Sequence, residues 1–234
     1  MWSLNPKDVL YEDNHLIAVN KQAGVNIQGD ITGDFPLLEA VREYIRVKYN
    51  KPGNVFCGLI HRLDRPVSGV AIFARTSKAL SRMNQQFAEK HPKKIYWAIV
   101  EKAPEKKDAS LVHYLVRNEK QNKSYVYAQE KPNSKLSKLS YSLLKQSDRY
   151  ALLEVELETG RHHQIRAQLA SIGCVIKGDL KYGAQRSNSD SSISLHARSL
   201  QFIHPISQEM LNLVAPVPND NLWNWFEQAI QENK

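Results

Sequence analysis

The chain has 234 residues, of which 42% are hydrophobic and 24% charged, a composition typical of a folded globular protein. No apolar run reaches the roughly 18 residues of a membrane-spanning helix, and the first residues lack the layout of a secretory signal. The formal net charge of +8 favours polyanionic partners such as nucleic acid, although a basic surface also serves solubility. The two cysteines, Cys57 and Cys174, make no disulfide framework and fit a reducing cytoplasm, where we expect the protein to act.

The first hundred residues predict strands and helices in turn. Apolar and β-branched runs indicate strands, and apolar residues three or four positions apart indicate surface helices. A threonine or serine just before the second helix fits an N-cap. We predict strands at 16–19, 70–74 and 93–100, and helices at 36–50 and from Thr76 or Ser77 onward.

From Leu111 onward, short strands and polar turns predict an antiparallel sheet. We expect strands within 111–116, 124–128, 139–144 and 150–157, helices at 162–173 and 221–230, and a flexible loop at 187–194. No repeat or linker divides the chain. The predicted fold is therefore α+β, one catalytic domain over 1–234 with a mixed, mainly antiparallel sheet, flanking helices and a central basic cleft, with or without two lobes around it.

Asp64 is the first candidate for chemistry. It stands between Arg62 and Arg65, on a turn ahead of the strand at 70–74. An acid beside arginines is usually a surface ion pair, but catalytic groups also lie on turns held by a rigid scaffold. Both interpretations stay open on local sequence alone.

The stretch ETGRHHQIRAQLASIG, residues 158–173, is the second candidate. It crowds Arg161, His162, His163 and Arg166 into the first turns of a predicted helix. Cations are disfavoured there by the helix dipole, so the pattern either indicates an anion nearby or is a merely basic helix end. Adjacent histidines point apart on a helix, and no zinc-binding spacing is present, so we expect no metal.

Tyr96 lies on the predicted strand 93–100 beside Lys93 and Lys94. Strand tyrosines usually pack in a core, but a ring beside cations can also stack on a base. Residues 111–140 carry six cations and two acids, which fits either a solvated hairpin or a basic surface. No P-loop, G-x-G-x-x-G or G-x-S-x-G pattern occurs, so we expect no cofactor.

Taken together, these segments resemble the RluA family of RNA pseudouridine synthases. HRLDRPVSGVAIFART resembles the family's HRLD motif, KKIYWAIV its tyrosine strand, and ETGRHHQIRAQLASIGCVIKGDLKYG its T-G-R-x-H-Q-I-R segment. SLHARSLQFIHP and LIAVNKQAGV match two further motifs in family order, over about residues 16–205. The departures are Val67 for Thr, Gln22 for Pro and Gln168 for His.

The resemblance implies that Asp64 is the catalytic carboxylate, that Arg166 pairs with it, and that Tyr96 stacks on the target uracil. Uracil would be detached at its N1–C1′ bond, rotated and reattached through C5, by attack of Asp64 on base or sugar or by proton abstraction. A uridine in stacked RNA must first be flipped out. The expected partner is ribosomal or transfer RNA, with no membrane, no obligatory protein partner and no S4-type domain. The expected RNA contacts are Arg62, Arg65, Arg161, His162, His163, Lys93 and Lys94.

The residues are also compatible with two other functions. The first is a metal-free RNA hydrolase that uses His61, His162 or His163 as acid and base, with Asp64 orienting the histidine. The second is a non-catalytic module that holds RNA in the same basic cleft. A hydrolase would shorten RNA, whereas an isomerase leaves its length unchanged.

Overall fold

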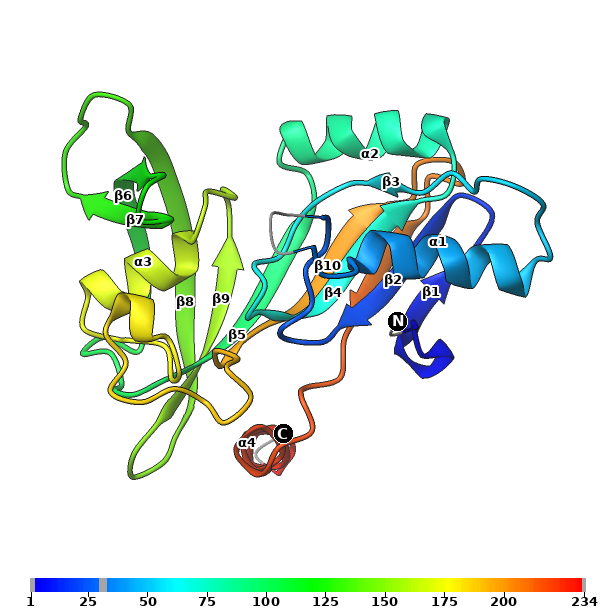
Figure 1. Ribbon diagram of the computed structural model, residues 1–234. Coiled ribbons are helices and arrows are strands. Elements are labelled where there is room, and N and C mark those ends of the chain that lie inside the picture. Colours follow the sequence, from blue (N-terminus) through cyan, green and yellow to red (C-terminus); the bar gives the residue numbers. More distant parts are fainter. Residues whose placement is uncertain (1–2, 30–32, 233–234) are drawn as a thin grey trace. The chain divides into compact units, whose positions relative to one another are not determined.

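The computed structural model describes residues 3–29 and 33–232, which form two compact units (Figure 1). The first unit comprises Met1–Pro92 and Arg198–Pro216, and the second comprises Lys93–Ala197 and Val217–Lys234. Strand β10, Leu195–Ile203, gives residues to both units. Among the described residues, no helix has the length and apolar character needed to cross a membrane.

The first unit is built on a sheet in the order β1-β2-β4-β10, with β3 on β4 and β11 on β10. Its elements are η1 (Pro6–Asp8), β1 (Val9–Glu12), β2 (Leu16–Lys21), α1 (Leu37–Lys48), β3 (Gly58–Leu59), β4 (Ser68–Ala74), α2 (Ser77–Ala88) and β11 (Met210–Val214). The pair β2–β4 is antiparallel, with Leu16 opposite Ala74 and Lys21 opposite Gly69. Every residue of β4 is buried, which explains its continuous apolar sequence.

Helix α2 covers one face of this sheet. Its buried residues Ala79 and Met83 pack into a core with Leu16 and Ile72. The Thr76 hydroxyl accepts the N–H of Ala79 at 3.2 Å, so the predicted N-cap is confirmed at Thr76. Burial of this apolar stripe fixes the helix on the sheet and makes the unit a rigid support for the turns between its strands.

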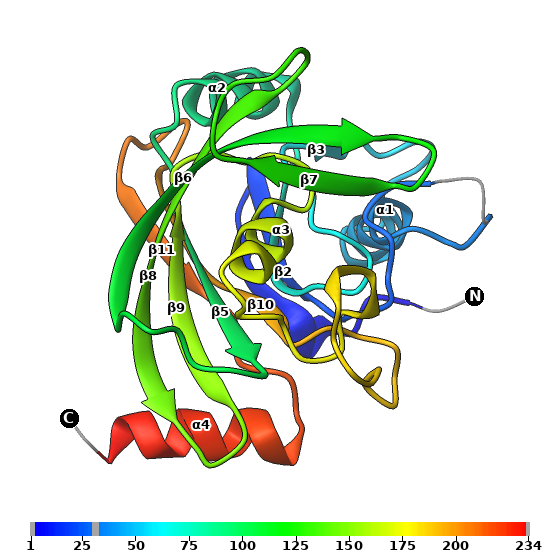
Figure 2. The same cartoon turned by 90° about the vertical axis from the view of Figure 1, so that its left-hand side faces the viewer.

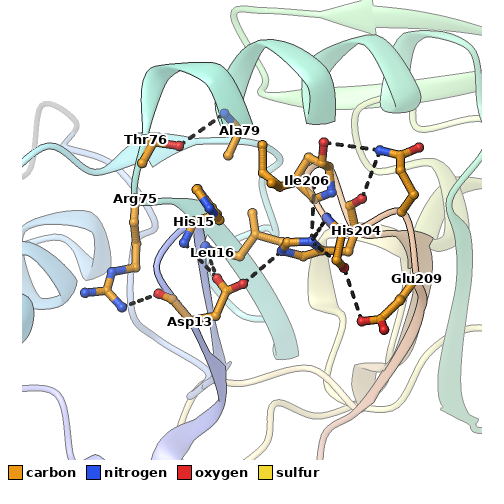
Figure 3. A network of polar contacts seen from close by, with 12 residues as sticks. Asp13, His15, Leu16, Arg75, Thr76, Ala79, His204, Ile206 and Glu209 are labelled. Atoms are coloured by element: carbon orange, nitrogen blue, oxygen red, sulfur yellow. Dashed lines mark hydrogen bonds and ion pairs between the residues drawn. The ribbon is translucent and has the colours of Figure 1, made fainter.

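A polar network ties two connections of the first unit together (Figure 3). The Asp13 carboxylate accepts the N–H groups of His15 (2.8 Å) and Leu16 (2.7 Å), and its other oxygen lies 2.9 Å from Nε2 of His204. Arg75 donates to the Asp13 carbonyl. The histidine of the FIHP sequence thus joins the turn after β10 to the turn after β1, which is a structural role.

The second unit is an antiparallel sheet in the order β5-β9-β8-β6-β7. Its elements are β5 (Lys93–Val100), β6 (Asp108–Asn118), β7 (Lys123–Tyr127), β8 (Lys135–Gln146), β9 (Ala151–Leu157), α3 (Gln164–Ser171), η2 (Leu180–Tyr182) and α4 (Asn221–Gln231). Helix α3 lies inside the curve of β6, β8 and β9 (Figure 2). The opposite face, over β5 and β9, is covered by α4, whose Trp223 and Phe226 pack with Trp97 and Leu152.

These elements confirm the predicted α+β class, with a mainly antiparallel sheet and flanking helices. Each predicted strand and helix overlaps an observed one. The helices at 36–50 and 162–173 are shorter than predicted, and the strand ranges 124–128 and 150–157 each reach one residue beyond the observed strand. Strands β1, β3, β10 and β11 were not predicted. Three of them, β1, β3 and β11, have only two to five residues and carry little periodicity. Both cysteines are buried and unbonded.

Candidate active site

Asp64 lies on a tight turn whose backbone is held from two sides. The N–H of Val67 donates to the Asp64 carbonyl at 3.0 Å, which closes the turn directly before β4. The carbonyl of Arg65 accepts the N–H of Gly24 at 2.8 Å, and the Arg65 side chain donates back to the Gly24 carbonyl at 3.0 Å. The turn after β2 therefore fixes the turn that carries the half-buried Asp64.

Lys21 is the residue that fastens these two turns from inside. Its side chain is only 1% exposed, and its ammonium donates to the carbonyls of Gln22 (3.0 Å), Arg65 (3.1 Å) and Val67 (2.7 Å). Burial lowers the pKa of Lys21 to about 7, while the nearby Asp64 carboxylate acts to raise it. Three carbonyl acceptors match the three N–H groups of the charged form, so the site is built for an ammonium.

The other charged groups of the HRLD segment have distinct surroundings. Arg62 is exposed, whereas Arg65 pairs with Asp34 at 2.8 Å as well as with Gly24. Nε2 of His61 accepts the backbone N–H of Ile72 at 3.2 Å, which leaves this nitrogen without a proton to give. His61 is therefore a structural residue that ties the segment to β4.

The segment before α3 differs from the sequence prediction. The helix begins at Gln164, so Arg161, His162 and His163 precede it and do not occupy its first turns. Gln164 itself stabilises the turn: its side-chain oxygen accepts the N–H of Arg161 (3.0 Å) and the hydroxyl of Thr159 (2.8 Å). Arg161 thus avoids the unfavourable positions inside the helix N-terminus, whereas Arg166 does lie in the first turn of α3, where the Asp179 carboxylate balances its charge.

The two histidines also differ from the prediction, because their rings stack at 3.8 Å between centroids and do not point apart. His163 is the N-cap and adopts the left-handed conformation, with φ of 52°, which turns its ring toward that of its neighbour. His162 lies 3.0 Å from the Ser124 hydroxyl through Nδ1 and 3.0 Å from Asn122 through Nε2. Burial, aided by the charge of Arg166, lowers the pKa of His163 to about 2, so this ring stays neutral.

Arg166 is buried on α3 and bound by a carboxylate that the sequence analysis did not consider. Its Nε and Nη2 donate to the two oxygens of Asp179 at 2.6 and 2.8 Å, and Asp179 is 1% exposed. The Tyr182 ring lies 5.2 Å from the guanidinium carbon, and its hydroxyl is 3.1 Å from Nδ1 of His163.

Tyr96 lies on the same side of the second unit's sheet as α3. It is opposite Val155 on β9, which in turn is opposite Tyr141 on β8. Tyr141 is opposite Ala109 on β6, and side chains alternate along a strand, so His113 projects to the same face. Gln168 of α3 lies 3.0 Å from Nδ1 of His113, so this is the face that α3 covers. The second unit therefore places Tyr96 and Arg166 on one face.

The remaining predicted RNA contacts are at the surface or near it. Lys93 is exposed and pairs with Glu156 at 3.1 Å, while Lys94 is half-buried. Arg161 is exposed and donates through Nε to the carbonyl of Leu136 at 3.3 Å. In the described parts of the chain, no three His, Cys, Asp or Glu side chains form a group suited to a metal ion.

Comparison with known proteins identifies the family. The family model described as RNA pseudouridylate synthase matches residues 15–171, a range that includes Asp64, Tyr96 and Arg166. The chain belongs to this family. Asp179 and Tyr182 lie beyond the matched range, yet they contact the arginine and the histidine that lie inside it.

Several curated pseudouridine synthases are similar to this chain. The ribosomal large subunit pseudouridine synthase C of Vibrio cholerae is 31% identical over 89% of this chain and 65% of its own length. The ribosomal large subunit pseudouridine synthase D of Zymomonas mobilis is 31% identical over 92% and 70%, and the RNA pseudouridine synthase YhcT of Bacillus subtilis is 32% identical over 91% and 69%. The chain thus spans about two thirds of the length of these relatives.

Two solved structures share the pseudouridine synthase fold. Human RNA pseudouridylate synthase domain containing 4 has a TM-score of 0.78 and 22% identity, and domain containing 1 has a TM-score of 0.73 and 22% identity. Each comparison covers 96% of this chain and 93% of the human chain. At this identity the likeness concerns the fold alone.

Three residues of the candidate site carried little or no signal in the sequence. The sequence around Lys21 gives only a weak sign that this lysine is buried. A lysine that ends an apolar strand just before a turn can equally extend its ammonium to the surface. Asp179 and Tyr182 stand in the quoted GDLKYG segment but offered no local sign that they contact Arg166. The pairing of Asp64 with Arg166 joins residues of different units and stays a prediction.

Proposed function

We propose that the protein isomerises uridine to pseudouridine in ribosomal RNA, with Asp64 as the catalytic carboxylate. The observation that carries the proposal is the match of the pseudouridine synthase family to residues 15–171, together with a half-buried carboxylate on a turn fixed at both ends. Several relatives are named as ribosomal large subunit pseudouridine synthases, which favours ribosomal RNA over transfer RNA. Such an enzyme would act in the cytoplasm.

Lys21 would be a positioning residue for Asp64. It holds the carbonyls of Arg65 and Val67, on the C-terminal side of the carboxylate, and in its protonated form supplies a positive charge close to it. A carboxylate that loses water when RNA binds takes up a proton unless an opposite charge keeps it ionised. Attack on the base, attack on the sugar and proton abstraction all require the ionised form, so the proposal does not depend on which of them operates.

Arg166 would pair with Asp64 once RNA closes the site. Asp179 holds one edge of its guanidinium, which keeps the long side chain in a single orientation. The planar fork suits a carboxylate and does not lose its proton. Asp179 would therefore be a positioning residue for Arg166, much as Lys21 is for Asp64.

The target uridine would be flipped out of its stack and held against Tyr96. Extrusion leaves a gap in the RNA, and the exposed Arg62, two residues before Asp64, would fill it and contact phosphate. The hydrolase alternative is disfavoured, because His61 accepts a backbone N–H through Nε2 and the lowered pKa of His163 makes it unsuited to act as a general acid. Both ring nitrogens of His162 lie within hydrogen-bond distance of side chains, those of Ser124 and Asn122.

The experiment is to map pseudouridines in ribosomal and transfer RNA from cells with and without the gene. We expect at least one ribosomal pseudouridine to disappear without the gene and to return when it is restored. The purified protein should install the same pseudouridine in an unmodified transcript without shortening it, and in the presence of a chelator. Identical maps from both strains, with no modification of the transcript, would refute the proposal.

A further inference from the structure

One face of the β6–β7–β8 region of the second unit carries a continuous row of tyrosine and aliphatic side chains. Tyr114 on β6 is opposite Tyr127 on β7 and Leu136 on β8, and Val116 is opposite Tyr125. Residues directly opposite each other in antiparallel strands project to the same face of the sheet. These five side chains therefore share one surface, which we call the tyrosine face.

The tyrosine face is open, in contrast to the other side of the same strands. Tyr125 and Tyr127 are each 38% exposed, and Leu136 is 40% exposed. The alternating residues Leu115 and Ser124 are buried on the side that α3 covers (Figure 2). The tyrosine face is thus an uncovered apolar face of a sheet, on the opposite side from Tyr96 and Arg166.

The charge around the tyrosine face identifies the kind of partner it suits. Residues 111–140 contain six Lys or Arg and two Glu, but the strand register divides the cations between the two faces. Lys123 and Lys138 project to the tyrosine face, whereas Arg117 and Lys135, opposite Ser124 and Leu115, project to the other. Lys138 is opposite Val112, a 53% exposed residue of the same face. The Lys123 ammonium lies 5.7 Å from the centre of the Tyr125 ring, so one ligand could contact both the cation and the ring.

We propose that the tyrosine face binds an unpaired segment of RNA, separately from the site that holds the target uridine. Exposed aromatic rings on an open sheet stack on bases of any sequence, and neighbouring lysines neutralise the phosphates. A purely apolar surface would suit a protein partner, but the lysines Lys123 and Lys138 on this face attract a polyanion. The inference deepens the proposed function, because it gives the enzyme a second contact with a large structured RNA.

Binding to a uridine-free RNA tests this proposal apart from the isomerase reaction. The probe is a fluorescent single-stranded oligoadenylate of about ten nucleotides, a length suited to a surface of this type. The variants are Tyr125→Ala with Tyr127→Ala, and the same pair changed to Phe. Trp225→Ala is the matched control, since Trp225 is an exposed aromatic residue of the same unit on α4.

We expect the alanine pair to weaken oligoadenylate binding at least about tenfold, because two stacking rings are lost. The phenylalanine pair should bind like the wild type, and Trp225→Ala should do so as well. Asp64→Asn should keep the oligoadenylate affinity, so loss of catalysis and loss of this contact are distinguishable. Circular dichroism and thermal melting verify that the alanine pair is folded.

Three results would overturn the inference. The first is a wild-type protein that does not bind oligoadenylate, and the second is an alanine pair that binds as tightly as the wild type. The third is a wild-type dimer that the alanine pair dissociates in light scattering, which would make the tyrosine face a contact between two copies of the chain. None of these results bears on whether the enzyme forms pseudouridine.

Discussion

The Asp64 turn and the Arg166 cluster are held in place by different means. Asp64 sits on a turn whose position is set by main-chain bonds between Gly24 and Arg65 and by one buried lysine, Lys21. Arg166 is set by side chains, namely a two-point ion pair with Asp179 and a stacked tyrosine. The first arrangement depends on backbone geometry, and the second depends on charge.

Because the two regions are held differently, substitutions in them should affect activity and stability differently. Most substitutions around Asp64 leave the main-chain bonds intact, so only Lys21 is expected to matter among its buried neighbours. In the Arg166 cluster, removal of either partner leaves a buried charge without its counterion, which is strongly destabilising. Substitutions in the two regions should therefore differ in how far activity and stability change together.

The largest expected effect is that of Arg166→Ala. Asp179 would be left 1% exposed without its partner, and loss of one half of a buried ion pair costs about 3–5 kcal/mol of unfolding free energy. We also expect turnover to fall at least roughly a hundredfold, because the charge-assisted contact that we propose between Arg166 and Asp64 would be lost. Urea unfolding and release of tritium from C5-labelled uridine measure the two effects.

A double variant separates the two losses. Arg166→Met with Asp179→Leu removes both charges, and such replacements are often neutral or stabilising. We expect it to recover most of the unfolding free energy but none of the turnover. Arg166→Lys should keep part of the turnover, because an ammonium retains the charge without the fork. Wild-type turnover in the double variant would show that Arg166 acts on stability alone.

An intermediate effect is expected for Lys21→Met. The side chain is too deeply buried to touch RNA, so RNA affinity should stay at the wild-type value. Turnover should fall about tenfold, because small displacements of a reacting group are costly. The control is Lys7→Met, which removes an exposed lysine from η1 and should change neither quantity. Equal turnover of Lys21→Met and wild type would exclude the positioning role.

The smallest effect concerns the pH dependence of stability. The pKa of Lys21 is about 7 in the folded protein, below its ordinary value of 10.5, so between these pH values the unfolded chain binds a proton that the folded chain does not. Stability must then rise with pH across this window, by at most about 1.4 kcal/mol per pH unit. Lys21→Met should lack this rise, which chemical denaturation at pH 7 and pH 9 will detect. Parallel curves for the two proteins would mean that Lys21 keeps its proton throughout.

The sequence predicted the parts of the molecule that depend on local pattern. The continuous apolar run of β4 and the amphipathic stripe of α2 have clear periods, and Thr76 is a recognisable cap. The turn that carries Asp64 was predicted because a proline and a glycine mark it. In each case the signal lies within a few residues of the feature it predicts.

The features that the sequence did not predict depend on contacts between residues far apart in the chain. The start of α3 was predicted too early, because the bonds of Gln164 to Thr159 and the left-handed His163 cannot be read from apolar spacing. Burial of Lys21 depends on the Asp64 turn 44 residues away, and that of Asp179 on its ion pair with Arg166. Such pairings are set by tertiary packing, which a single sequence does not display.

The most direct test of the central claim is the reaction of the Asp64→Asn variant with RNA that carries tritium at C5 of uridine. Reattachment of uracil through C5 expels the hydrogen of that carbon, so tritium release counts turnovers. The amide keeps the shape of Asp64 but not its charge or basicity, and RNA affinity should be unchanged. We predict that the wild type releases tritium and that the variant, equally folded and equally bound to RNA, releases none. Substantial release by Asp64→Asn would contradict the assignment of Asp64 as the catalytic carboxylate.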